Sequence, residues 1–241
     1  QIPKLRDVLQ KCFKKIQNET IKIFDYTISV GVGRCYKGDA QISTSYMEAV
    51  QALKLKIIYG YGSIIMWNRD LAKYKYYYPA TIEKYILNQI ETGNCHAVEN
   101  TVKQLVEEIK SKAGLSSDNV MQIFNQLVGN TVIKYLADFN IDMSQVFGSN
   151  FNIYNELLEK ETLDYIQQWL INIYRTVIEY LSRNTSDDNV SKIIDYINNN
   201  YKRDIGIADI ADYIGLSYSH VRKIFKDKTG KNIVDYINSL R

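Results

Sequence analysis

Residues 207–230 read IADIADYIGLSYSHVRKIFKDKTG, and their pattern predicts the fold of the carboxyl-terminal part of the chain. Apolar residues recur at helical spacing on both sides of Gly215-Leu216-Ser217, which predicts two helices joined by a three-residue turn. Gly215 can take the positive φ that such a turn needs, and Ala211 is small enough for the next helix to cross it closely. The predicted core positions of this helix-turn-helix are Ile210, Ala211, Ile214, Leu216, Val221 and Ile224.

The second of these helices carries a basic outward face. Between Ser217, a natural N-cap, and Gly230, four basic residues and one acidic residue leave a net charge of +3, as much as the whole chain carries. Helical spacing turns the polar side chains away from the apolar ones, so this face can enter the major groove of DNA. We therefore predict a recognition helix whose outward residues are Ser219, Arg222, Lys223 and Lys226.

Each of these residues suggests a particular contact. Arg222 is the main candidate for reading a base, because its guanidinium can donate two hydrogen bonds to guanine. Lys223 is expected to share that role or to bind phosphate, and Lys226 to strengthen binding to every sequence. A solvated surface would also explain a basic face, but not the turn pattern beside it. Contacts with the DNA backbone that set the register are predicted for Tyr218, His220, Lys202 and Arg203.

Residues 191–241 resemble the first half of an AraC/XylS-type DNA-binding domain. The stretch 207–230 is similar to the first helix-turn-helix of that family, and NIVDYINSLR at 232–241 is similar to the start of its linker helix. Family members carry two such units in tandem. The resemblance implies that Ser219, Arg222 and Lys223 lie where the first unit reads bases. Since one unit is present here, we expect weak binding by this piece of a longer protein.

The first 70 residues mix helical and strand patterns. Residues 5–16 have helical spacing, residues 28–32 alternate as a strand does, and residues 64–67 form a second apolar run. Between the strands, Ser45 and Glu48 have the spacing of a capping box. A strand, a helix and a strand in this order predict two parallel strands in one sheet. The predicted buried stripe of this helix is Tyr46, Ala49, Val50, Leu53 and Ile57, with Gly60 closing it.

The same region resembles a known module. YTISVGVGRCY at 26–36 and STSYMEAVQALKLKIIYGYGSIIMWN at 43–68 resemble the closing half of a degenerate GGDEF-like domain, which precedes AraC-type units in larger bacterial signalling regulators. The chain contains no Gly-Gly dipeptide, so the cyclase signature is missing. Residues 31–33 also lack the third glycine of a dinucleotide fingerprint, since Tyr36 stands in its place. We expect no nucleotide site.

The stretch from Pro79 to Arg183 is helical in pattern throughout. Gly93 and Gly114 mark helix ends, while Ser117 and Thr162 precede two further helices. Residues 182–189 are polar and aperiodic, as a linker is. We predict a mainly α protein with a small α/β part, divided into a partial GGDEF-like segment (1–72), a helical linker or regulatory domain (73–186) and a truncated AraC-type helix-turn-helix domain (187–241).

Composition excludes several classes. Hydrophobic residues make up 46% of the chain and charged ones 24%, which are globular values, and the apolar run 57–67 is too short to span a membrane. Three widely spaced cysteines favour free thiols in the cytoplasm, although the parent protein could be membrane-anchored. The adjacent Cys95 and His96 lack further ligands at zinc-site spacing. We expect no metal, no cofactor and no enzyme activity.

The partners expected are double-stranded DNA, a second copy of the chain in a homodimer, and a sensor or receiver domain upstream in the parent protein. The predicted function is that of a sequence-specific DNA-binding transcription regulator whose upstream domains transmit a signal. One alternative stays open. The helical region 75–185 could instead make the chain a regulatory module that binds a protein or a small ligand and dimerises.

Overall fold

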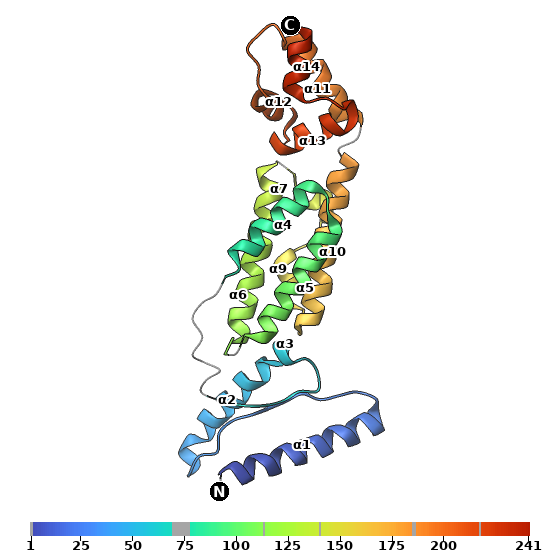
Figure 1. Cartoon of the computed structure of the whole chain (residues 1–241). Coiled ribbons are helices and arrows are strands. Elements are labelled where there is room, and N and C mark those ends of the chain that lie inside the picture. Colours follow the sequence, from blue (N-terminus) through green and yellow to red (C-terminus); the bar gives the residue numbers. More distant parts are fainter. Residues whose placement is uncertain (1, 69–77, 113, 140, 185–186, 217) are drawn as a thin grey trace. The chain divides into compact units, whose positions relative to one another are not determined.

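The computed structural model of the chain describes residues 2–68, 78–112, 114–139, 141–184, 187–216 and 218–241. The fold is mainly α-helical with a small α/β part, which confirms the predicted class (Figure 1). The chain divides into two compact units. Unit 1 comprises Gln1–Pro79, Val102–Gln126 and Asn152–Leu170, and unit 2 comprises Ala80–Thr101, Leu127–Phe151 and Ile171–Arg241. The domain boundaries drawn from the sequence stay predictions.

The α/β part belongs to unit 1 and has the predicted strand, helix, strand order. Its elements are α1 (Ile2–Phe24), β1 (Val30–Val32), the 3₁₀ turn η1 (Asp39–Gln41), α2 (Ile42–Lys54), α3 (Lys56–Tyr59) and β2 (Ile64–Met66). The strands β1 and β2 pair in parallel, with Val30 opposite Ile64 and Val32 opposite Met66. The chain therefore crosses over between two neighbouring strands, as the sequence predicted.

Two glycines let β1 and the segment after it lie directly against α2. A Cβ atom added to Gly31 would lie 2.1 Å from the carbonyl oxygen of Ala49, and one added to Gly33 would lie 2.0 Å from that of Ser45. Real Cβ contacts are never this short, so any side chain at either position would push strand and helix apart. The glycines thus serve packing rather than a dinucleotide.

The start of α2 differs from the prediction. The helix begins at Ile42, and Ser45 lies inside it instead of capping it. The Ser45 hydroxyl donates to the carbonyl oxygen of Arg34, while Glu48 accepts hydrogen bonds from Arg34 and Tyr36. The predicted capping box is therefore wrong, because partners from another part of unit 1 take both of its side chains.

The predicted buried stripe of α2 is also wrong in part. Tyr46 is 66% exposed and Leu53 39% exposed, whereas Ala52 and Leu55 are buried. The helix breaks at Leu55, which rotates the following turn α3 and brings Ile57 into the interior. Gly60 ends α3 with a φ of 80°, so its predicted closing role is confirmed.

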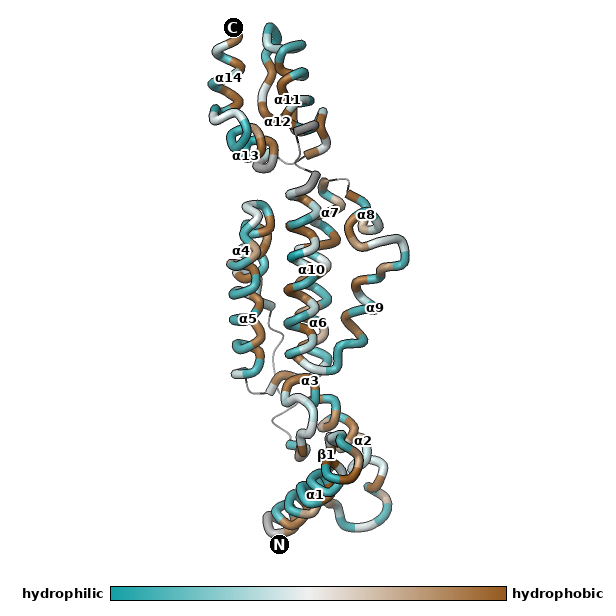
Figure 2. The backbone as a smooth tube through the Cα atoms, turned by 90° about the vertical axis from the view of Figure 1, so that its right-hand side faces the viewer, coloured by the Kyte–Doolittle hydropathy of each residue, from teal (hydrophilic) through white to brown (hydrophobic). Residues whose placement is uncertain are grey.

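The helices between Pro79 and the carboxyl-terminal region follow the predicted order. They are α4 (Ala80–Thr92), α5 (Cys95–Ser111), α6 (Ser117–Val128), a π-helical turn (Gly129–Ile133), α7 (Lys134–Asp138), α8 (Met143–Phe147), α9 (Ile153–Leu158) and α10 (Leu163–Asn184). Along α5, α6 and α10, hydrophilic and hydrophobic residues alternate as in amphipathic helices (Figure 2). Among the described helices, none combines the length and the apolarity needed to cross a bilayer.

The π-helical turn interrupts a stretch that the sequence predicts as one continuous helix. Within unit 2, the Thr131 hydroxyl lies 2.7 Å from the Tyr174 hydroxyl, and both side chains are fully buried. Thr131 also donates to the carbonyl oxygen of Leu127 at 2.7 Å. This pair satisfies two buried hydroxyl groups in the interior, and burial raises the pKa of Tyr174.

The carboxyl-terminal region of unit 2 has its own hydrophobic core. Its helices are α11 (Asp187–Asn200), α12 (Ile207–Ile214), α13 (Tyr218–Thr229) and α14 (Ile233–Leu240). All four helices contribute buried apolar side chains to one cluster. Its most buried members are Ile193, Ile197, Ile210, Val221 and Phe225.

Candidate nucleic-acid interface

The turn between α12 and α13 has the geometry predicted from the sequence. Gly215 has φ 72° and ψ 31°, the left-handed conformation that ends α12. Its N–H donates to the carbonyl oxygen of Ala211 at 2.9 Å, and the Leu216 N–H donates to the same oxygen at 3.1 Å. A Cβ on Gly215 would meet no described atom within 4 Å. The glycine is therefore needed for its backbone conformation and not for a close approach.

The inward face of α13 is apolar, as predicted. Val221, Ile224 and Phe225 are buried, and Ala211 of α12 is only 6% exposed in the same core. The predicted core residues Ile214 and Leu216 pack against this cluster but are only partly buried. Burial of one face fixes the rotation of α13, so the opposite face is the one that it presents to solvent.

Three of the predicted DNA-binding residues lie on that exposed face: Arg222, Lys223 and Lys226. The guanidinium carbon of Arg222 lies 5.6 Å from the centroid of the Tyr218 ring, within range of a cation–π interaction. Tyr218 is itself 50% exposed at the first turn of α13. The Tyr218 ring therefore packs against the Arg222 guanidinium on the side that faces the amino-terminal end of α13.

Lys223 has a hydrogen bond within unit 2. Its Nζ atom donates to the carbonyl oxygen of Thr92, the last residue of α4, at 2.7 Å. Carbonyl groups at the end of a helix lack intrahelical partners and attract cations. Lys223 must therefore exchange this hydrogen bond for one with DNA if it binds a base or a phosphate.

Lys202 and Arg203 lie outside α13, on the turn between α11 and α12, and both are exposed. The Lys202 ammonium lies 5.8 Å from the centroid of the Tyr201 ring. The turn is closed locally by the Arg203 N–H, which donates to Asn200 at 2.8 Å, and by the Ile205 N–H, which donates to Arg203 at 3.0 Å. A second exposed basic segment is thus attached to the same hydrophobic core that supports α13.

Three of the residues singled out in the sequence have side chains outside the described part of the structure. Ser219 and His220 belong to α13, but the described part of the chain does not include their side chains. Ser217, the predicted N-cap of α13, lies outside the described residues altogether. Their roles stay predictions.

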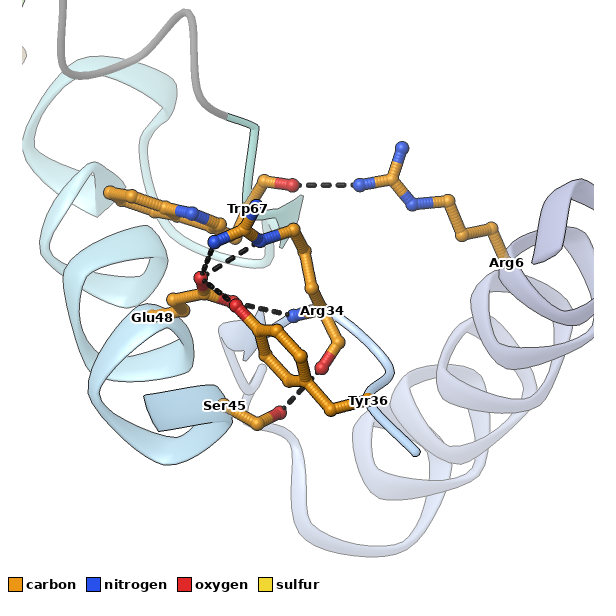
Figure 3. A network of polar contacts seen from close by, with 6 residues as sticks. All are labelled: Arg6, Arg34, Tyr36, Ser45, Glu48 and Trp67. Carbon is orange, nitrogen blue, oxygen red and sulfur yellow. Dashed lines mark hydrogen bonds and ion pairs between the residues drawn. The ribbon is translucent and has the colours of Figure 1, made fainter. Parts of the chain in front are cut away.

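Sequence reasoning missed a polar cluster in unit 1 (Figure 3). Glu48 is only 7% exposed, and its carboxylate accepts from the backbone N–H of Arg34 at 2.9 Å, from Arg34 Nε at 2.8 Å and from the Tyr36 hydroxyl at 2.6 Å. Nearby, the Arg6 guanidinium donates to the carbonyl oxygen of Trp67 at 2.7 Å. The spacing of Glu48 pointed to a helix cap, and no sequence signal pairs it with Arg34.

The hydrogen bonds from Arg34, more than those from Tyr36, lower the pKa of Glu48 to about 2 despite its burial. A carboxylate with so low a pKa, already accepting several hydrogen bonds, is a poor proton acceptor. The cluster therefore fastens the end of β1 to α2 rather than performing acid–base chemistry.

The geometry of unit 2 defines a helix-turn-helix with an exposed basic second helix, and the relatives of the chain belong to the same class. The chain is similar to YtdP of Bacillus subtilis (strain 168), which is named as an uncharacterized HTH-type transcriptional regulator. The two are 20% identical over 245 residues, which cover 97% of this chain and 31% of YtdP. An uncharacterized HTH-type transcriptional regulator of Staphylococcus aureus (strain MRSA252) is 24% identical over 131 residues, 52% of this chain and 17% of that protein.

The chain thus spans less than a third of the length of the curated relatives it matches. No family model matches it. No solved structure matches it significantly.

Proposed function

We propose that the chain is part of a sequence-specific DNA-binding transcription regulator of the AraC type, with α13 as its recognition helix. The observation that carries this proposal is the two-sided character of α13, which buries Val221 and Phe225 and exposes Arg222, Lys223 and Lys226. The similarity to proteins named as HTH-type transcriptional regulators supports it. So does the resemblance of residues 207–230 to the first helix-turn-helix of AraC-type domains.

In this proposal, α13 enters the major groove of double-stranded DNA. Arg222 reads a base, most simply a guanine, while Lys223 reads a neighbouring base or binds a phosphate. Lys226 neutralises phosphate charge, and Tyr218, His220, Lys202 and Arg203 fix the position of the helix on the DNA backbone. Ser219 is proposed to contact a base next to the one that Arg222 reads.

The upstream elements are proposed to transmit a signal and not to catalyse a reaction. The parallel pair β1–β2 with its crossover helix α2 fits a GGDEF-like segment, and the absence of the Gly-Gly signature supports the loss of cyclase activity. Incubation with GTP and magnesium should give no turnover.

Light scattering tests dimerisation. If the chain forms a homodimer both with and without residues 190–241, the upstream elements carry the dimer contacts.

The test of the DNA-binding proposal is selection of bound sequences from a random pool of duplex DNA. The chain should enrich a short motif, and the Arg222→Ala variant should lose the preference at one position of that motif while the others stay. Binding without any enrichment would leave only sequence-independent affinity, typically about 10⁻⁴ to 10⁻⁶ M, and would overturn the base-reading role. Lys231→Ala, which removes an exposed charge outside α13, is the matched control.

A further inference from the structure

One side chain that the sequence did not single out contacts the turn that carries Lys202 and Arg203. Arg241 Nε donates to the carbonyl oxygen of Tyr201 at 2.8 Å, and Arg241 Nη2 donates to that of Arg203 at 2.6 Å. Both carbonyl groups follow the last residue of α11, Asn200, where no further helical turn continues, and the Arg203 carbonyl oxygen also accepts from the Ile205 N–H at 3.0 Å. A guanidinium is planar and has donors in a fixed fork, so it can hold two carbonyl groups at once.

Arg241 is itself fixed by the position of α14. Ile233 and Ile237 bury one face of α14 in the core of the carboxyl-terminal region. The Tyr236 ring packs edge-to-face on the Phe225 ring of α13, with 5.2 Å between centroids. Arg241 follows directly after α14, and its N–H donates to Ile237 at 3.3 Å. The guanidinium is therefore held by a helix that contacts the inner face of α13.

Resting on the proposed function, we propose that Arg241 is a positioning residue that sets the Lys202–Arg203 turn relative to the recognition helix. Among the described residues, the other backbone hydrogen bonds of the turn are local, from Arg203 to Asn200, from Ile205 to Arg203 and from Tyr201 to Ile197. These bonds shape the turn, and the Tyr201 and Ile205 side chains pack against the core that α13 shares. The two bonds from Arg241 add a link from the backbone carbonyl groups of the turn to α14, and they leave the exposed Lys202 and Arg203 side chains available for phosphate.

This arrangement would hold two groups of DNA contacts at a fixed spacing. Arg222 and Lys226 approach from α13, and Lys202 and Arg203 approach from the turn. Each lysine or arginine that neutralises a phosphate adds about 0.9 to the slope of log K against log salt. A disordered turn would lower that slope, because its two cations would no longer lie at fixed phosphates. The slope therefore measures positioning separately from fold stability.

The experiment uses the 241-residue chain and a random-sequence 30-base-pair duplex, with affinity measured by fluorescence anisotropy over a salt series. The variants are Arg241→Ala, Arg241→Lys, the pair Lys202→Ala/Arg203→Ala, and the pair combined with Arg241→Ala. Lys231→Ala controls for loss of one charge, and thermal melting shows that each variant is folded. NMR order parameters of residues 201–205, measured without DNA, report the turn directly.

We expect the Lys202→Ala/Arg203→Ala pair to lower the slope by about 2. Arg241→Ala should lower it by more than 1, Arg241→Lys should fail to restore it because an ammonium cannot fork two carbonyl groups, and the combined variant should lose no more than the pair does. The order parameters of 201–205 should fall in both Arg241 variants.

Three results would overturn the positioning role. These are unchanged order parameters, full restoration by Arg241→Lys, or a further slope loss of about 0.9 in the combined variant, which would make Arg241 a phosphate contact itself. A failure of the proposed function looks different. In that case the wild-type chain does not bind duplex DNA, or the Lys202→Ala/Arg203→Ala pair keeps the full slope, while the order parameters still respond to Arg241.

Discussion

The guanidinium of Arg222 lies over the ring of Tyr218 one helical turn before it, with 5.6 Å between Cζ and the ring centroid. The two residues are four positions apart in α13, so they lie on the same face of the helix. A ring under the guanidinium restricts the rotamers of the arginine and leaves its N–H groups pointing outward. Tyr218 therefore orients the side chain that we expect to read a base.

This relationship predicts different effects for two variants. Arg222→Ala should weaken binding to a selected site by about 1–3 kcal/mol and relax the preference at one base position. Tyr218→Phe keeps the ring and should retain that preference, whereas Tyr218→Ala should reduce it. Gel shifts on selected and random duplexes measure both quantities. Equal losses on the two DNAs for Arg222→Ala would contradict base reading.

Lys226 should behave as a phosphate contact. It lies exposed in the last turn of α13. Lys226→Ala should weaken binding to selected and random DNA alike and lower the salt slope by about 1. Anisotropy titrations at several salt concentrations measure this. A loss confined to the selected sequence would instead assign Lys226 to base recognition.

Gly215 should be sensitive to substitution because of its backbone conformation. Gly215→Ala forces a side chain into φ 72° and should lower the free energy of unfolding by about 1–2 kcal/mol. Gly206→Ser is the matched control, because Gly206 has an extended φ of −112° at the N-cap of α12 and a serine side chain can cap the helix. Urea denaturation followed by circular dichroism compares the two. Equal losses in the two variants would contradict a specific requirement for the left-handed φ at Gly215.

The Glu48–Arg34 pair should make unit 1 sensitive to acid. The folded pKa of Glu48 is about 2, below its ordinary value of 4.5, so the stabilisation from this group is complete above about pH 4.5 and is lost as the pH falls toward 2. Glu48→Gln should lower stability at neutral pH by roughly 1–3 kcal/mol and flatten the pH dependence between these values.

Tryptophan fluorescence can follow this transition, because both tryptophans of the chain, Trp67 and Trp169, belong to unit 1. Urea titrations at several pH values between 2 and 7 supply the comparison. Glu159→Gln, a change at an exposed carboxylate, is the control. A wild-type profile as flat as that of Glu48→Gln would contradict a stabilising role for the pair.

Sequence patterns predicted those elements whose causes are local. The order of the helices, the parallel pairing of β1 with β2, the left-handed Gly215 and the apolar face of α13 all follow from periodicity and from single residues with special backbone freedom. The spacing of Ser45 and Glu48 predicted a capping box that is wrong for the same reason. A capping box is a local pattern, and nothing within a few residues of Glu48 shows that Arg34 competes for its carboxylate.

A glycine turn followed by a short helix with a buried apolar face and an exposed basic face can be predicted from the residues alone, because 3.6-residue periodicity and charge placement act within one element. The groups that contact this helix and its neighbours depend instead on tertiary packing. Phe225 contacts Tyr236, 11 residues further along the chain, and Arg241 contacts the carbonyl groups of Tyr201 and Arg203, 40 and 38 residues before it, because the shared core brings these segments together. Which backbone oxygens a guanidinium reaches depends on how the helices pack, and no local pattern records that.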